Sequence, residues 1–110
     1  MRLRATVPVV SAALLLTVAG SAFAAQGDFI YQVGDRESGA HHLLVDPPGR
    51  GCVRLPLPDP REPAHHVDNR TDSTAVVFLD ERCQSDVYYV VPAHSKAPAG
   101  VLARSVSFSS

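Results

Sequence analysis

Residues 68–91 read DNRTDSTAVVFLDERCQSDVYYVV, and this stretch decides the fold class. Residues 74–79 and 87–91 are two runs rich in β-branched and aromatic side chains, and turn-forming polar residues precede each run. Residues 74–79 are apolar on both faces, which predicts a central strand buried on both sides. Cys83 lies in the polar turn between the runs. The stretch therefore predicts two antiparallel strands joined by a turn that carries a cysteine.

The rest of the chain extends this pattern. No segment after residue 24 has helical periodicity, and prolines and glycines divide the chain into short pieces. Further strands are expected at residues 29–33, 42–45, 52–55, 64–67 and 105–109. The proline-rich residues 57–63 and residues 92–100 are predicted to be loops. Roughly six to eight short strands without a helix predict an antiparallel β-sandwich or a small barrel.

The start of the chain resembles an export signal. A short basic segment is followed by an apolar run at residues 9–19 and by small residues around Phe23. This order is typical of a secretory signal peptide, here residues 1–24, with cleavage between Ala24 and Ala25. The alternative is a membrane anchor, but the apolar run is shorter than the roughly 20 residues that a membrane span requires. We therefore expect a secreted, extracellular bacterial protein with no membrane attachment after cleavage.

Residues 25–110 would then form a single small all-β domain. The signal carries two of the 10 basic residues and none of the 11 acidic ones, which leaves 8 against 11 and a net charge of −3. A mildly acidic domain has no electrostatic reason to bind nucleic acid. We expect a monomer.

Cys52 and Cys83 are the only cysteines. In an exported domain of this size, an even number of cysteines predicts a disulfide. The chain-entropy estimate gives such a crosslink about 3–4 kcal/mol of stabilisation. The alternative is a reactive or metal-binding thiol pair, but the two residues lack a C-x-x-C spacing.

The segment Phe78-x4-Cys83-x-Ser85 resembles the aromatic-x4-aromatic-x-Gly hairpin of βγ-crystallin-type Greek keys. Residues 104–108 look like the strand that closes such a motif, and the resemblance covers residues 51–110. It implies a βγ-crystallin-like Greek-key sandwich of antiparallel strands. Ser85 departs from the family pattern, because glycine serves there where the turn needs a positive φ. In the resembling group, the closest functional precedents are metalloproteinase inhibitors and killer-toxin-like proteins.

Calcium-binding members of this family use an Asn/Asp-Asn/Asp-x-x-Ser/Thr-Ser loop just before the closing strand. The corresponding residues 59–64 and 100–104 offer too few oxygen ligands for calcium, which needs six to eight. Residues 68–73 match by letters, but we expect them to follow the short strand at 64–67. The resemblance therefore implies the fold without the metal site, and no cofactor is expected. A calcium-binding protein stays as an alternative.

The histidines come as two adjacent pairs, His41-His42 and His65-His66, with His94 alone. Neutral imidazoles bind zinc or copper, and one histidine from each pair could converge on neighbouring strands. Successive strand residues point to opposite faces, so neither pair should chelate a metal by itself. We expect these histidines to be exposed on edges or loops.

No pattern of catalytic residues is present. The chain has no Gly-x-Ser-x-Gly motif. The carboxylate pairs Asp80/Glu81 and Asp35/Glu37 are expected in hairpin turns, where acidic residues serve turn geometry and solubility. The chain is therefore not expected to be an enzyme.

The remaining hypotheses concern binding. Residues 55–63 form a proline-rich loop that could enter a protease cleft, because prolines reduce the entropy lost on binding. Of Tyr88 and Tyr89, one should pack inward and the other lie on the surface. Asn69 begins a glycosylation sequon that we expect to be unmodified in a bacterial protein.

The leading hypothesis is a secreted non-enzymatic interaction module, a metalloproteinase inhibitor whose partner is a secreted protease or another extracellular protein. The alternatives are a structural or stress-related envelope protein without a discrete ligand, and a toxin.

Overall fold

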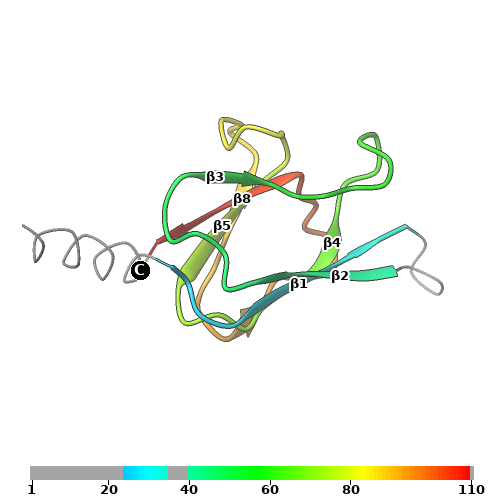
Figure 1. Cartoon of the computed structure of the whole chain (residues 1–110). Helices are drawn as coiled ribbons and strands as arrows, with labels where there is room; N and C mark the ends of the chain where they lie inside the picture. Colours follow the sequence, from blue (N-terminus) through cyan, green and yellow to red (C-terminus); the bar gives the residue numbers. More distant parts are fainter. Residues whose placement is uncertain (1–23, 35–39, 110) are drawn as a thin grey trace, which may run out of the picture.

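The computed structural model describes residues 24–34 and 40–109 (Figure 1). Its strands are β1 (Asp28–Val33), β2 (Ala40–Val45), β3 (Cys52–Arg54), β4 (His65–Asn69), β5 (Thr74–Phe78), β6 (Tyr88–Val91), β7 (Ser95–Lys96) and β8 (Ser105–Ser109). Within the described ranges, no helix is long and apolar enough to cross a membrane. The expected signal peptide, apart from Ala24, and the Asp35/Glu37 pair lie outside the described residues.

The strands form two four-stranded antiparallel sheets, in the orders β2-β1-β4-β7 and β3-β8-β5-β6. The predicted all-β class and its two antiparallel sheets are therefore confirmed. The strands of the two sheets correspond at an offset of four strands: β2, β1, β4 and β7 of the first sheet occupy the places of β6, β5, β8 and β3 in the second. The two halves of the chain are thus equivalent, and each places its third strand in the sheet of the other half: β3 pairs with β8, and β7 pairs with β4.

The core lies between the two sheets, and alternation along the strands selects its residues. Phe29, Tyr31 and Val33 are buried on one face of β1, as predicted. Val106 and Phe108 are buried on β8, also as predicted. The rings of Phe29 and Phe108 meet edge to face across the sandwich, with centroids 5.3 Å apart. The first and last long strands therefore meet in the centre of the core.

The predicted strand at residues 74–79 is central but is not buried on both sides. As β5 it lies between β8 and β6, and Ala75 and Val77 face the core. Val76 and Phe78 lie on the outer face and are half-buried. Burial on both faces was wrong because a two-layered sandwich has no third layer to cover its outer face.

Two other strands differ from the predictions. β4 runs from His65 to Asn69 and not over residues 64–67, so Asp68 and Asn69 belong to the strand. β7, Ser95–Lys96, lies in the segment predicted to be a loop and pairs with the end of β4. A strand of two residues is too short to show alternation, so only the tertiary pairing reveals it.

The predicted disulfide is present. Cys52 at the start of β3 is bonded to Cys83 in the loop between β5 and β6, with their Cα atoms 5.9 Å apart. Because β3 comes from the first half of the chain and β5 from the second, the bond ties the two halves together.

Candidate functional site

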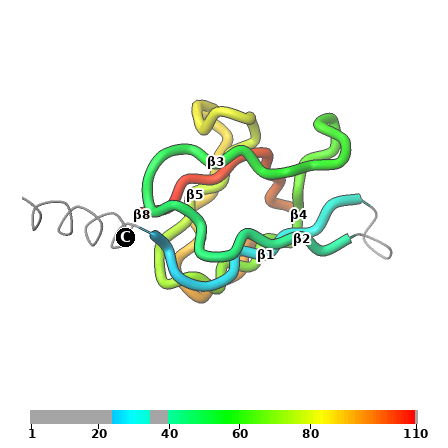
Figure 2. The backbone as a smooth tube through the Cα atoms, viewed as in Figure 1, coloured from blue at the N-terminus to red at the C-terminus, as the bar shows by residue number. Residues whose placement is uncertain are grey.

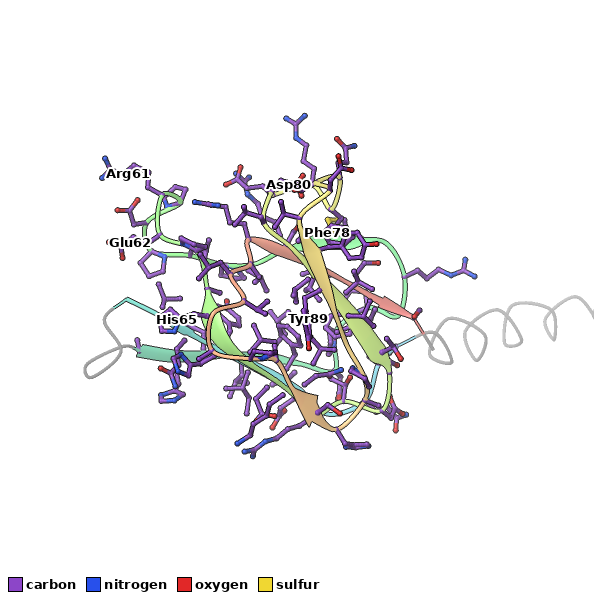
Figure 3. The ribbon with its side chains drawn as sticks, turned by 180° about the vertical axis from the view of Figure 1, so that it is seen from behind. Arg61, Glu62, His65, Phe78, Asp80 and Tyr89 are labelled. Carbon is purple, nitrogen blue, oxygen red and sulfur yellow. A yellow bond between two sulfur atoms is a disulfide. The ribbon has the colours of Figure 1, made fainter. Side chains whose placement is uncertain are left out.

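Two loops project from the same side of the sandwich (Figure 2). The proline loop, residues 55–63, joins β3 to β4, and the cysteine loop, residues 79–87, joins β5 to β6. Arg61 and Glu62 stand at the far end of the proline loop, and Asp80 stands in the cysteine loop (Figure 3). A shallow depression of about 530 Å³ lies between the two loops. We consider these loops together because one side chain holds both.

That side chain is Arg104, which precedes β8. Its Nε donates to the carbonyl oxygen of Pro60 at 3.0 Å, and its Nη2 donates to that of Arg61 at 3.2 Å. Its Nη1 donates to the carbonyl oxygen of Leu79 at 3.0 Å. The guanidinium is a rigid planar fork of donors, so these bonds fix the loops relative to one another.

The base of the proline loop is also held. The Tyr31 hydroxyl donates to the carbonyl oxygen of Pro56 at 2.8 Å. Burial raises the pKa of the Tyr31 hydroxyl, so this group stays a neutral donor. The Leu55 amide donates to the carbonyl oxygen of Arg104 at 2.9 Å. The loop is therefore restrained at its base as well as near its end.

The end of the proline loop is closed by its own residues. The Asp59 carboxylate accepts from the Arg61 amide at 3.0 Å and from Arg61 Nε at 3.2 Å. These bonds hold the pKa of Asp59 below its usual value. The Glu62 amide donates to the Asp59 carbonyl at 2.9 Å. The Arg61 side chain is 90% exposed, so a fixed backbone presents a charged side chain to solvent.

Asp80 organises the cysteine loop. Its carboxylate accepts from the backbone amides of Arg82, Gln84 and Ser85 at 3.0–3.1 Å. Desolvation alone raises the pKa of Asp80, but these three donors together outweigh it and lower the pKa. The carboxylate thus serves turn geometry, the role that the sequence predicts for it.

Glu81 forms an ion pair with Arg54 of β3, with Nη2 and Oε1 2.7 Å apart. The hydrogen bond from Arg54 lowers the pKa of Glu81. The neighbouring carboxylates of Asp80 and Glu81 therefore have separate partners.

Ser105 anchors the cysteine loop to β8. Its buried Oγ donates to the Asp80 carbonyl at 2.6 Å and accepts from the Cys83 amide at 3.0 Å. In the first half of the chain, His65 Nε2 lies 2.7 Å from the Gly34 carbonyl, which can only accept, so the imidazole donates. Asp80 and Gly34 each lie two residues beyond the strand partner of Ser105 or His65. Serine and histidine thus make equivalent anchors in the two halves.

The prediction that adjacent histidines point to opposite faces was wrong for one pair. The rings of His65 and His66 are in contact, with their Nδ1 atoms 2.6 Å apart. The register between β1 and β4 shifts at this point, and His66 has a φ of 51°. This bulge breaks the alternation and brings both rings to one side.

The other histidines lie apart from this pair. His41 bonds to Gln32 at 2.9 Å, and His42 stacks on Tyr31 with centroids 5.5 Å apart. His94 is exposed. Across residues 24–34 and 40–109, no group of three or more His, Cys, Asp or Glu residues could hold a metal ion.

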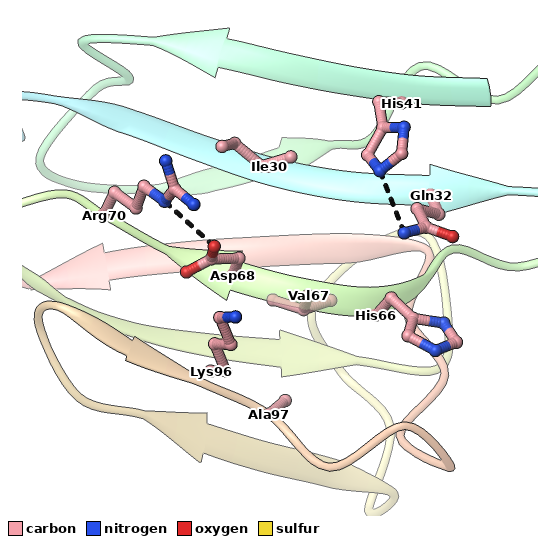
Figure 4. Close-up of a pocket in the computed structure, with 9 residues that line it drawn as sticks. All are labelled: Ile30, Gln32, His41, His66, Val67, Asp68, Arg70, Lys96 and Ala97. Atoms are coloured by element: carbon pink, nitrogen blue, oxygen red, sulfur yellow. Dashed lines mark hydrogen bonds and ion pairs between the residues drawn. The ribbon is translucent and has the colours of Figure 1, made fainter. Parts of the chain in front are cut away.

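A polar hollow of about 300 Å³ lies on the outer face of the first sheet (Figure 4). Asp68 and Arg70 form an ion pair in it, with Oδ2 and Nε 2.9 Å apart, and His41, His66 and Lys96 also line it. The hollow holds no cysteine, serine or paired carboxylate that could act as a nucleophile or an acid–base pair. Its charged and polar groups can hold a small polar ligand by ion pairing and hydrogen bonding.

Asn69, the sequon residue, is fully buried. Its Nδ2 is shared among the carbonyl oxygens of Ser73, Val91 and Pro92 at 2.9–3.1 Å. Its Oδ1 accepts from the amide and the hydroxyl of Thr71. The side chain therefore joins the end of β4 to the following turn and to β6. Sequence reasoning missed this role, although the Asn-x-Thr-x-Ser spacing is typical of a turn closed by its own side chains.

Tyr88 and Tyr89 are both exposed, at 59% and 40%. Tyr89 lies opposite the buried Val77 and so lies on the core side of the sheet, but its exposure shows that the prediction of one inward-packed tyrosine was wrong. It stays accessible because β6 is the edge strand of its sheet.

Comparison of the chain with protein-family models, curated proteins and solved structures finds no match. The function must therefore be inferred from the residues and geometry of this chain. The two loops joined by Arg104 project from the sandwich (Figure 2) and are fixed by hydrogen bonds to their backbone.

Proposed function

We propose that this chain is a secreted, non-enzymatic inhibitor of a metalloproteinase, built on a βγ-crystallin-like sandwich. The observation that carries the proposal is the bonding of Arg104 to the backbone at the end of the proline loop. Its guanidinium binds the carbonyls of Pro60 and Arg61. An inhibitory loop needs a backbone that is already ordered before it meets the protease.

The strand order supports the crystallin-like part of the proposal. In a Greek key, the fourth strand returns to lie beside the first. In this chain β4 lies beside β1, and β8 lies beside β5. The anchoring of the hairpin loop by Ser105 occurs in the segment that carries the family-like spacing.

The inhibitory mechanism rests on restraint of the proline loop. Prolines at 56, 58, 60 and 63 fix φ and remove backbone donors on both sides of Arg61. Little conformational freedom remains to be lost when the loop enters a cleft, so more of the contact energy contributes to binding. If the protease cuts the loop between Pro56 and Pro60, Tyr31 holds the first cut end and Arg104 the second near their original positions, which favours resealing over release.

The proposal also requires that the protein is exported from the cell. Cleavage between Ala24 and Ala25 would leave Ala25 as the first residue, and its nitrogen donates to the Pro47 carbonyl at 2.8 Å. The new amino terminus could keep this bond. A disulfide is compatible with the oxidising conditions outside the cell.

The experiment is a titration of the mature protein, residues 25–110, against a panel of secreted metalloproteases, with serine proteases for comparison. We expect slow, tight inhibition of at least one metalloprotease, with the proline loop uncut after prolonged incubation. Mass spectrometry of the mixture reports any cut. Absence of inhibition across the panel, in a folded protein with an intact disulfide, would reject the inhibitor and favour the structural alternative.

A further inference from the structure

β6 is an edge strand with one side unpaired. It ends the second sheet, and its only strand partner among the described residues is β5. The Leu79 amide donates to the Val87 carbonyl at 3.0 Å, so residues 87, 89 and 91 turn their backbone groups toward β5. Because these directions alternate, the N–H and C=O groups of Tyr88 and Val90 point away from the sheet. They are free to pair with another strand.

Two of the other three edge strands carry features that discourage such pairing. β3 has three residues, including Arg54, and is fastened by the disulfide. β7 has two residues, one of them Lys96. β2 has neither a charged residue nor a proline, but its exposed residues include the polar His41, whereas the exposed residues of β6 are all apolar or aromatic. Natural sheets protect their edges by shortness, charge or proline, and β6 has none of these within Tyr88–Val91.

The surface around β6 is apolar on both faces. On the outer face, Tyr88 lies beside Phe78 with ring centroids 6.0 Å apart, and Val90 lies beside Val76. On the inner face, Tyr89 lines a largely apolar hollow of about 260 Å³ together with Leu102. An isolated monomer therefore leaves an unpaired backbone and an apolar surface in the same place.

We propose that two copies of the domain pair antiparallel through β6, with Tyr88 opposite Val90 of the second copy and Tyr89 on the two-fold axis. The second copy fits because the strand complements itself: the outward groups of Tyr88 and Val90 satisfy those of Val90 and Tyr88 across the axis. Each Tyr89 ring then lies beside the other, next to the hollow formed with Leu102. This pairing replaces the monomer expected from the sequence.

Neighbouring residues select this register. A shift that placed Val90 opposite itself would set Tyr88 against Pro92, which has no N–H to donate. A shift that placed Tyr88 opposite itself would set the Asp86 carboxylate against Val90. In the proposed register the two Asp86 residues lie about 20 Å apart, so no like charges oppose each other. The proline loop takes no part, and the dimer can fail without affecting the proposed inhibition.

The first test is the mass of the mature protein by sedimentation equilibrium from about 10 μM to about 1 mM, the range suited to a small interface. We expect the weight-average mass to rise toward twice that of the monomer. Val90→Lys should stay monomeric throughout, because a charge at an edge opposes pairing. Leu43→Lys is the matched control: Leu43 of β2 is 52% exposed and Val90 is 48% exposed. This control should dimerise like the wild type.

The second test fixes the register. Residue 89 would form a non-hydrogen-bonded pair with itself across the axis, with Cα atoms about 4.5 Å apart, a separation that a disulfide can bridge. Tyr89→Cys should therefore give a crosslinked dimer on a non-reducing gel. Val87→Cys, with its Cα atoms about 13 Å apart, should not. In both variants, mass analysis of proteolytic fragments should show an intact bond between Cys52 and Cys83. A wild type that is monomeric at every concentration, an unaffected Val90→Lys dimer, or crosslinking through residue 87 in place of 89 would overturn the proposal.

Discussion

Ser105 and His65 bind the backbone just beyond β5 and β1, respectively, by the same kind of hydrogen bond from different side chains. Ser105 Oγ donates to the Asp80 carbonyl at 2.6 Å, and His65 Nε2 donates to the Gly34 carbonyl at 2.7 Å. Both residues lie on the fourth strand of their half and reach two residues beyond their partner on the first strand. In each half of the chain, a side chain of the fourth strand therefore fixes the backbone just beyond the first strand.

Ser105→Ala should destabilise the domain by about 1–3 kcal/mol, because it leaves the Asp80 carbonyl and the Cys83 amide without their buried partner. Urea denaturation at neutral pH measures the change. Ser107→Ala, two residues along the same strand, is the control and should stay within about 0.5 kcal/mol of the wild type. Equal effects of the two substitutions would contradict the anchoring role.

Asn69→Ala should be among the most damaging single substitutions, with a loss of about 3 kcal/mol or more. It removes the donor to three carbonyls and the acceptor for Thr71 from a fully buried position. Asn69→Asp keeps an acceptor for Thr71 but places a carboxylate against the carbonyls, so it should not restore stability. The thermal midpoints of both variants test this, and a wild-type midpoint for either would contradict it.

Reduction of the bond between Cys52 and Cys83 should lower the free energy of unfolding by about 3–4 kcal/mol, given the 31-residue separation. The double variant Cys52→Ser/Cys83→Ser should lose a similar amount without reductant. Melting curves of the wild type with and without reductant, and of the double variant, make the comparison. If reductant also destabilised the double variant, the stability lost by the wild type on reduction would not come from the bond between Cys52 and Cys83.

The stability contributed by Asp80 should disappear in acid. Its pKa is lowered in the folded state, so its contribution is fully present above the ordinary value of 3.8 and is lost as the pH falls through the lowered pKa. Asp80→Asn should therefore be less stable than the wild type at pH 7, and the difference should shrink as the pH falls below 3.8 and through the lowered pKa. Asp86→Asn, in the same loop, should match the wild type at pH 7. A constant difference between Asp80→Asn and the wild type at all pH values would contradict this account.

Local patterns predicted much of the fold. Alternation at Phe29, Tyr31 and Val33 identified the core face of β1, and the even cysteine count identified the disulfide. These features depend on neighbouring residues or on composition, so they can be predicted from the sequence alone. The full burial expected of β5 was wrong because alternation does not report how many layers surround a sheet.

The long-range features were not predictable in this way. Arg104 reaches carbonyls 43 and 44 residues earlier in the chain, and no local pattern marks a side chain that binds distant backbone. The contact between His65 and His66 depends on a bulge in the pairing with β1, which alternation alone cannot show. The proline loop was identified from its composition, but its restraint is visible only in three dimensions.

The central claim is that the hydrogen bonds of Arg104 order the proline loop so that it can inhibit a metalloproteinase. The substitution Arg104→Ala tests this claim most directly. Inhibition of one metalloprotease by the wild type, Arg104→Ala and the control Arg82→Ala should be measured together with cleavage of the loop. We expect Arg104→Ala to inhibit at least about tenfold more weakly, since roughly 1.4 kcal/mol of ordering is enough for that change, and to be cut within residues 55–63. Arg82→Ala should inhibit like the wild type and stay uncut. Equal inhibition by Arg104→Ala and the wild type, with the loop uncut in both, would contradict the account.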